Sequence, residues 1–273
     1  MRVRVVFLLK NKGAFVPFHH QYLLTQLVDV ILKEVPAEYH PYRDYNFSAL
    51  KGQTKISKSG LHFYSSRVTL VFSSANEAFV HAFLHSLFGY REVSVGNLLL
   101  EPELAEKEEP IDLGEAVKYV CISPVVLTSP DANDFYSKKF ITPDTDVFSD
   151  LLYESTMYRM ERTGDYSSER IASFYKFQIV PDKEYLSKVR QEEKKFARIY
   201  PVYENQPMGN QSKQEVRGYT FPFTLYAGNE VQQFLFHCGL GAYTPQGFGM
   251  LDLVNSDSKR KTVPYPLSNL MAS

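Results

Sequence analysis

Twelve residues near the C-terminal end of the sequence, GLGAYTPQGFGM from Gly239 to Met250, form its most distinctive local pattern. The glycines Gly239, Gly241, Gly247 and Gly249 can adopt positive φ and let backbone N–H groups approach an anion such as a phosphate. A helix stop followed by a tight turn would need the same residues, so a purely structural role is the alternative. The pattern is not the dinucleotide-binding fingerprint, because it follows a helical pattern and precedes a strand-like one.

A second chemical feature is a histidine, His40 in PAEYHPYRDY, that precedes a basic stretch. Imidazole has an ordinary pKa of ~6.5 and can transfer protons near neutral pH. Residues 43–67 contain one acid, Asp44, and can face phosphates or form an ordinary solvated surface. Their basic residues are Arg43, Lys51, Lys55, Lys58 and Arg67. A second basic stretch, 183–217, holds eight basic and five acidic residues.

The charge of the whole chain hides this uneven distribution. The 273 residues carry 30 Lys plus Arg and 31 Asp plus Glu, a net charge of −1, which by itself argues against a nucleic-acid binder. Residues 101–115, EPELAEKEEPIDLGE, hold seven of the acids and one Lys. Without them 29 basic and 24 acidic residues remain, so the rest of the chain is basic.

Composition excludes several classes of protein. A hydrophobic content of 44% is typical of a globular chain, and no apolar run approaches the ~18 residues of a membrane span. We expect no signal peptide and no membrane contact. The only cysteines, Cys121 and Cys238, are too few for a disulfide framework and have no zinc-like spacing with histidines. A cytoplasmic protein without a metal site or cofactor is expected.

Hydrophobic periodicity predicts the elements that must position these groups. The first half follows the order β-α-β-β-α-β, with strands at 2–10 and 90–100, helices at 20–34 and 75–89, and a hairpin of 45–56 and 61–72 around a turn at SKSG. The order recurs in the second half. Its predicted elements are a strand from residue 116, a helix at 145–162, extended segments near 174–180, 195–203 and 216–227, a helix at 229–238 and a strand at 247–254.

Each half therefore predicts a ferredoxin-like α+β unit with helices on an antiparallel sheet. We expect domains at 1–100 and 116–254, joined by the acidic segment 101–115 as a linker, and a loosely ordered tail at 255–273.

Paired ferredoxin-like units with a glycine-rich G-x-G-x5-G-F-G segment near the C-terminus resemble the RAMP superfamily. The closest resemblance within it is to the CRISPR repeat-RNA-processing endoribonucleases of the sixth Cas family. Further matching segments are VPFHHQY (16–22), ISPVVLTSP (122–130), KKFITPDTDVFSDLLYES (138–155) and GYTFPFTLYAGNEVQQFLFHCGLG (218–241). The resemblance covers about residues 1–254 and is more specific in the second half.

The resemblance implies cleavage of CRISPR repeat transcripts without metal. In this chemistry the ribose 2′-OH attacks the adjacent phosphate and leaves a 2′,3′-cyclic phosphate and a 5′-OH. It needs a base, an acid and a cation that stabilises the phosphorane charge. Repeat RNA is the implied partner, and other Cas effector subunits are possible partners. Whether the protein is a monomer or a homodimer stays open.

The resemblance also assigns roles to residues. Relatives keep a catalytic His just after the first helix, which His40 matches, with Tyr39 beside it and Lys51 for charge stabilisation. Alternative catalytic residues are His19, His20, Lys55 and Arg43. RNA contacts are assigned to Gly239, Gly241, Gly247, Gly249, Lys55, Lys58 and Arg67.

One departure from the family pattern bears on mechanism. Some relatives carry a tyrosine in the first helix where this chain has Asp29. A non-catalytic RAMP subunit that holds guide RNA is therefore the main alternative function. A small-molecule enzyme of the same fold is a third.

Overall fold

The computed structural model describes residues 1–128, 139–191, 196–205, 211–254 and 261–266. Its contacts divide the chain into two units, 1–110 with 245–247 and 259–273, and 111–244 with 248–258. We call them unit 1 and unit 2 and describe each by itself. No helix in the described ranges combines the length and the apolar character that crossing a bilayer requires.

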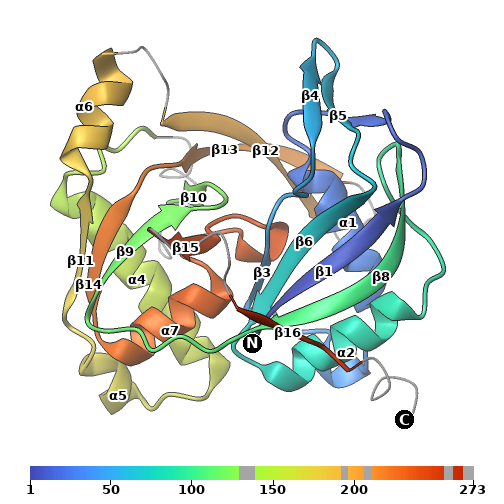
Figure 1. Ribbon diagram of the computed structural model, residues 1–273. Coiled ribbons are helices and arrows are strands. Elements are labelled where there is room, and N and C mark those ends of the chain that lie inside the picture. Colours follow the sequence, from blue (N-terminus) through green and yellow to red (C-terminus); the bar gives the residue numbers. More distant parts are fainter. Residues whose placement is uncertain (129–138, 192–195, 206–210, 255–260, 267–273) are drawn as a thin grey trace. The chain divides into compact units, whose positions relative to one another are not determined.

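Unit 1 is built around a central strand that pairs on both of its edges (Figure 1). The main sheet has the order β16-β8-β1-β6-β3, all antiparallel, with β7 on β8, and a small second sheet has the order β2-β5-β4. The strands are β1 (Arg2–Leu9), β2 (Phe15–Val16), β3 (Tyr45–Phe47), β4 (Thr54–Ser57), β5 (Gly60–Phe63), β6 (Arg67–Ser74), β7 (Val93–Val95), β8 (Leu98–Glu108) and β16 (Thr262–Pro264). The helices are α1 (Gln21–Leu32), η1 (Ala37–Tyr39) and α2 (Glu77–Phe88).

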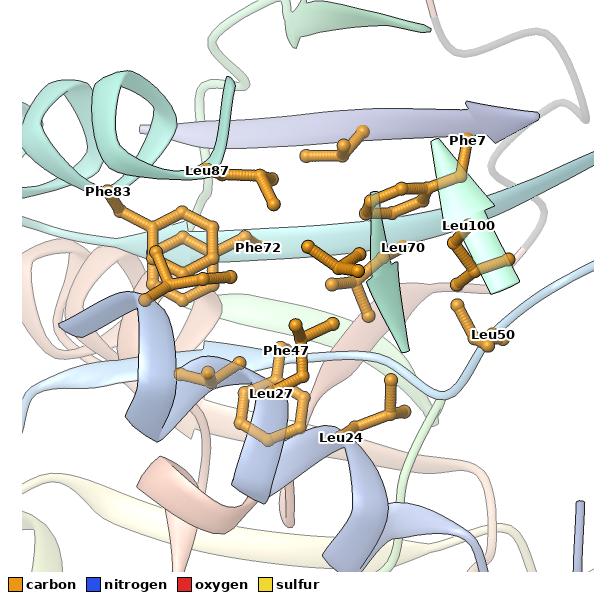
Figure 2. Packing of buried hydrophobic residues seen from close by; sticks show 14 of the residues in the cluster. Phe7, Leu24, Leu27, Phe47, Leu50, Leu70, Phe72, Phe83, Leu87 and Leu100 are labelled. Atoms are coloured by element: carbon orange, nitrogen blue, oxygen red, sulfur yellow. The ribbon is translucent and has the colours of Figure 1, made fainter. Parts of the chain in front are cut away.

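Alternation along β1 explains how the helices are held. Val3, Val5 and Phe7 share one face of the strand and join the hydrophobic core that α1 and α2 also enter. Figure 2 shows Leu24 and Leu27 of α1 and Phe83 and Leu87 of α2 among the side chains of this core. Asn76 caps α2, since its Oδ1 accepts a hydrogen bond from the N–H of Phe79 (3.0 Å).

Unit 2 repeats the plan with an added sheet. Its main sheet has the order β11-β14-β9-β15, and its second sheet has the order β10-β13-β12. The strands are β9 (Ala116–Cys121), β10 (Val125–Val126), β11 (Phe177–Pro181), β12 (Ala197–Asn205), β13 (Gln211–Tyr219), β14 (Phe223–Ala227) and β15 (Leu251–Leu253). The helices are α4 (Asp146–Thr163), α5 (Ser168–Ala172), α6 (Lys183–Gln191) and α7 (Asn229–Cys238). The turn η2 (Thr244–Gln246) has its first residue in unit 2 and the other two in unit 1.

The fold class predicted from the sequence is confirmed as two tandem ferredoxin-like units with antiparallel sheets. The helices at 20–34, 75–89, 145–162 and 229–238 are also confirmed, with small shifts of their ends. The predicted hairpin is confirmed where β4 pairs with β5, from Thr54 with Phe63 to Ser57 with Gly60. Its arms are each divided, the first into β3 and β4 and the second into β5 and β6, and the helix α6 was not predicted.

Two predictions about the ends of the units were wrong. The acidic segment 101–115 is not a linker throughout, because β8 continues to Glu108 and pairs with β1. The tail 255–273 is not loose throughout, because β16 pairs with β8 and the Tyr265 side chain is buried in the core of unit 1. Residues 255–260 and 267–273 lie outside the described part of the chain.

The core of unit 1 yields a stability prediction. The rings of Phe72 and Phe83 stack with centroids 3.8 Å apart, and both side chains are fully buried. We expect Phe72→Ala to lower the free energy of unfolding by about 3 to 5 kcal/mol, because it leaves a cavity. Urea denaturation followed by circular dichroism measures this. Ile56→Ala, at a side chain 78% exposed, is the control and should change it by less than about 0.5 kcal/mol. A loss below about 1 kcal/mol for Phe72→Ala would contradict this packing.

Candidate functional site

His40 lies on the surface of unit 1, directly after η1. Its Nε2 is 3.0 Å from the carbonyl oxygen of Val35. A carbonyl oxygen can only accept, so Nε2 carries the proton of the neutral ring and Nδ1 carries the lone pair. No hydrogen bond of Nδ1 to a described residue occurs. The exposed ring therefore offers a proton acceptor at a fixed tautomer.

Arg43 places a positive charge beside this histidine. Its Nη1 donates to the carbonyl oxygens of His40 (2.6 Å) and Tyr42 (2.7 Å), which holds the exposed guanidinium against the same turn. Guanidinium keeps its charge at any working pH and carries five N–H donors, so donors remain for a phosphate.

Asp29 of α1 belongs to the same charged group. Burial raises the pKa of its half-buried carboxyl, and the positive charges of Arg43 and Lys33 act against that shift. Burial also raises the pKa of the Tyr45 hydroxyl, with a further contribution from the negative charge of Asp29. Asp29 of α1 thus places a negative charge that interacts with the positive charge of Arg43.

Tyr39 serves mainly in packing. Its ring meets the ring of Phe79 edge-on at a centroid distance of 5.7 Å and joins the rim of the core. Burial and the neighbouring Glu38 carboxylate raise the pKa of its hydroxyl, so the hydroxyl stays protonated at neutral pH.

The structure does not bring Lys51 next to His40. The backbone of Lys51 forms an isolated β-bridge with that of Thr69 in β6. Tyr45, which follows the turn that holds His40 and Arg43, pairs with Ser74, five residues farther along the same strand. Five residues of β-strand span about 17 Å. Lys51 is exposed and lies toward the start of α1, where Gln21 Nε2 is 3.5 Å from the carbonyl oxygen of Phe47.

The alternative histidines sit at that other end of α1. His20 is the N-terminal cap residue of the helix, whose 12 residues span about 18 Å, so His20 and His40 cannot act on one phosphate together. His20 is 5% exposed, and burial lowers its pKa. Its Nδ1 is 3.2 Å from the carbonyl oxygen of Pro17, while its Nε2 is buried without a hydrogen-bond partner. His19 is exposed.

The predicted RNA-contacting cations divide into two groups. Arg67 makes a two-point ion pair with Glu103 of β8, Nε to Oε2 at 2.6 Å and Nη2 to Oε1, so its charge is already compensated. Lys55 and Lys58 lie on the β4–β5 hairpin, are exposed, and make no ion pair among the described residues. They remain able to face phosphates.

The part of the glycine-rich loop that belongs to unit 2 is packed tightly. A Cβ at Gly241 would lie 2.4 Å from the carbonyl oxygen of Val126, and one at Gly249 would lie 1.9 Å from that of Leu240. Gly239, Gly241, Gly247 and Gly249 all have positive φ. Backbone N–H groups of 239, 240, 242, 248, 249 and 250 already donate within the protein. The glycines thus meet the structural requirement, and most of the loop amides are committed to the fold.

A buried arginine that sequence reasoning missed holds this loop from α4. Arg159, 8% exposed, donates through Nη1 to the carbonyl oxygens of Gly239 (2.8 Å) and Gly241 (3.3 Å) and through Nη2 to that of Cys238 (2.8 Å). The available signal was its position seven residues after Leu152, on the buried face of the helix.

No three His, Cys, Asp or Glu side chains within the described ranges gather into a group that could hold a metal ion. The candidate side chains in unit 1 are the imidazole of His40, the guanidinium of Arg43 and the exposed lysines of the β4–β5 hairpin.

Comparison with known proteins gives one family. The model described as "CRISPR associated protein Cas6, C-terminal" matches residues 105–253. We found no significant match among curated protein sequences.

Solved structures share the fold across nearly the whole chain. One described as "Characterization of a Cas6-related gene from Pyrococcus furiosus" aligns with a TM-score of 0.71 at 18% identity, over 94% of this chain and 99% of that one. "An RAMP protein binding different RNA substrates" aligns with a TM-score of 0.70 at 20% identity, over 93% and 99%. A Cas6 product complex aligns with a TM-score of 0.56 at 13% identity, over 93% and 100%.

These identities are low, so the solved structures show the shared fold. The family model adds membership, because residues 105–253 are more than half of the 273. The chain belongs to the Cas6 family of CRISPR-associated proteins.

Proposed function

We propose that this protein is a metal-independent endoribonuclease that cuts CRISPR repeat transcripts and releases guide RNAs. The observation that carries the proposal is the exposed His40, with Nε2 held at the carbonyl oxygen of Val35 and Arg43 beside it, in a member of the Cas6 family. The likeness to a Cas6 product complex and to a RAMP protein that binds RNA supports RNA as the substrate.

The geometry suggests how the proton moves. The lone pair of His40 Nδ1 takes the proton of the ribose 2′-OH while the 2′-oxygen bonds to phosphorus. The bond from phosphorus to the 5′-oxygen breaks, and that oxygen takes a proton from water or from a protonated histidine. The products are a 2′,3′-cyclic phosphate and a 5′-OH.

Charge stabilisation falls to Arg43 in this proposal. It is the cation fixed against the carbonyl oxygen of His40. Lys51 pairs with Thr69, about 17 Å along β6 from Ser74, the residue that pairs with Tyr45, and is better placed to contact the RNA backbone. A guanidinium suits the oxygens of a phosphorane because it donates in a planar fork.

The first prediction tests catalysis. A labelled CRISPR repeat transcript is incubated with the protein in EDTA at pH 7.5. We expect cleavage, and we expect His40→Ala to slow it by about 100-fold or more because the proton-transfer group is lost. Single-turnover rates at saturating protein measure this.

His85→Ala is the matched control, since His85 is an exposed histidine on α2. It should leave the rate unchanged, and the affinity of His40→Ala for the transcript should stay within threefold of wild type. An uncut transcript in EDTA, or cleavage unaffected by His40→Ala, would rule out the mechanism.

The second prediction separates His20 from catalysis. Burial lowers the pKa of His20 in the folded state, so the unfolded state binds more protons as the pH falls below its ordinary pKa of ~6.5. Above that pH the neutral His20 ring costs the folded state no stability. As the pH falls from there toward the lowered pKa, the folded state loses stability relative to the unfolded state. We expect His20→Asn, whose amide can still donate to Pro17, to lose less stability than wild type between pH 8 and pH 5.5 in urea denaturation.

His20→Asn should also cleave within about fivefold of wild type at pH 7.5. Loss of cleavage by a folded His20→Asn protein would transfer the catalytic role from His40 to His20.

One observation favours a second function. Asp29 occupies the helix position of the family tyrosine, and Lys51 is remote from His40, so the residue set is not that of an intact family triad. A subunit that holds guide RNA without cutting it would bind the repeat tightly and leave it intact. The EDTA experiment distinguishes the two functions.

A further inference from the structure

The hairpin of β4 and β5 is an insertion between β3 and β6, the second and third strands of the β-α-β-β-α-β plan of unit 1, and Figure 1 shows it projecting beyond the main sheet. Residues 51–64, KGQTKISKSGLHFY, contain three lysines and no acid. Lys51, Lys55 and Lys58 are exposed, and no ion pair joins them to an acid among the described residues. Elsewhere in unit 1, Arg4, Lys10 and Arg67 all meet glutamates of β8.

One face of the small sheet carries rings between these charges. Phe15, His62 and Lys55 lie opposite one another across β2, β5 and β4 and so share a face. The rings of Phe15 and His62 have centroids 5.2 Å apart. Tyr64 is 44% exposed, and Lys55 Nζ lies 5.0 Å from its ring centroid.

The face is held rigidly. His62 Nδ1 is 2.9 Å from the carbonyl oxygen of Gly13, and its Nε2 is 2.9 Å from Ser57 Oγ, so hydrogen bonds at both ring nitrogens fix the orientation of the ring. Gly60, with φ of +140°, approaches so closely that a Cβ there would lie 2.1 Å from the carbonyl oxygen of Val16. A ligand would therefore meet a preformed surface, with little ordering to oppose its binding.

We infer that the face formed by Phe15, Lys55, His62 and Tyr64 is a stacking platform for single-stranded RNA. Bases stack on exposed rings regardless of sequence, and lysines track the backbone phosphates. An acidic partner protein would use the lysines but not the exposed tyrosine. The inference rests on the proposed function, since it assigns this surface to an unpaired part of the repeat.

The test uses fluorescence anisotropy with a labelled 12-nucleotide polyuridylate, which has no secondary structure. We expect Tyr64→Ala to weaken its binding by about tenfold, because one stacked base is lost. Tyr64→Phe keeps the ring and should stay within twofold of wild type. Circular dichroism confirms that each variant is folded.

The lysines are tested through salt. The double variant Lys55→Ala, Lys58→Ala should reduce the slope of log affinity against log salt concentration by about 1.4, because each lost phosphate contact on a single strand is worth about 0.7. The matched control replaces Tyr175 and Lys176, an exposed tyrosine and lysine of unit 2, by alanine. The control should change neither the affinity nor the slope.

The outcomes separate this inference from the proposed function. Tyr64→Ala binding within twofold of wild type, or no binding of polyuridylate by wild type at about 50 mM salt, overturns the platform even if the repeat is cut. Tyr64-dependent binding supports the platform even if the repeat is left intact, and in that case the proposed cleavage fails.

Discussion

Strand β1 is the constraint on which unit 1 depends. It pairs antiparallel with β6 on one edge and β8 on the other, and its alternate residues are buried under α1 and α2. This register places the acidic residues of β8 next to basic residues of β1 and of the segment that follows it. Glu108 meets Arg2 at 3.1 Å in a buried pair, and Glu101 meets Lys10 at 2.6 Å. Pairing with β8 therefore compensates several basic residues of unit 1, whereas Arg43 and the lysines of the β4–β5 hairpin make no ion pair among the described residues.

Much of the fold could be predicted because local signals agree with the global plan. The four long helices follow apolar periodicity, and Asn76 and the SKSG turn mark boundaries through their own side-chain chemistry. The acidic segment was misjudged because the sequence does not show which residues lie beside it in the fold. A run of acids without basic neighbours indicates a solvated linker. Once β8 lies beside β1, the same acids become partners of Arg4 and Lys10. Register of this kind cannot be derived from composition.

The candidate site shows a similar division. Residue type and position after the first helix make His40 a candidate, whereas the tautomer of its ring depends on the carbonyl oxygen of Val35 and can be read only from the structure. The family resemblance gives Lys51 a role beside His40, but the extended chain between Tyr45 and Lys51 carries Lys51 away along β6. The glycines were interpreted as amides open to an anion. Contacts with Val126 and Leu240 give Gly241 and Gly249 a steric reason, and Arg159 supplies donors that fix the loop.

The strand β16 has a consequence for how the protein is made. It covers the edge of β8, and Tyr265 enters the core of unit 1 more than 150 residues after β8 ends. The ribosome synthesises β8 long before β16. While the intervening residues of unit 2 are being made, the part of β8 that β16 later covers has no strand beside it. The charged side chains that line β8, Glu106 and Lys107 among them, suit that interval, because charge discourages an open strand from pairing with another chain.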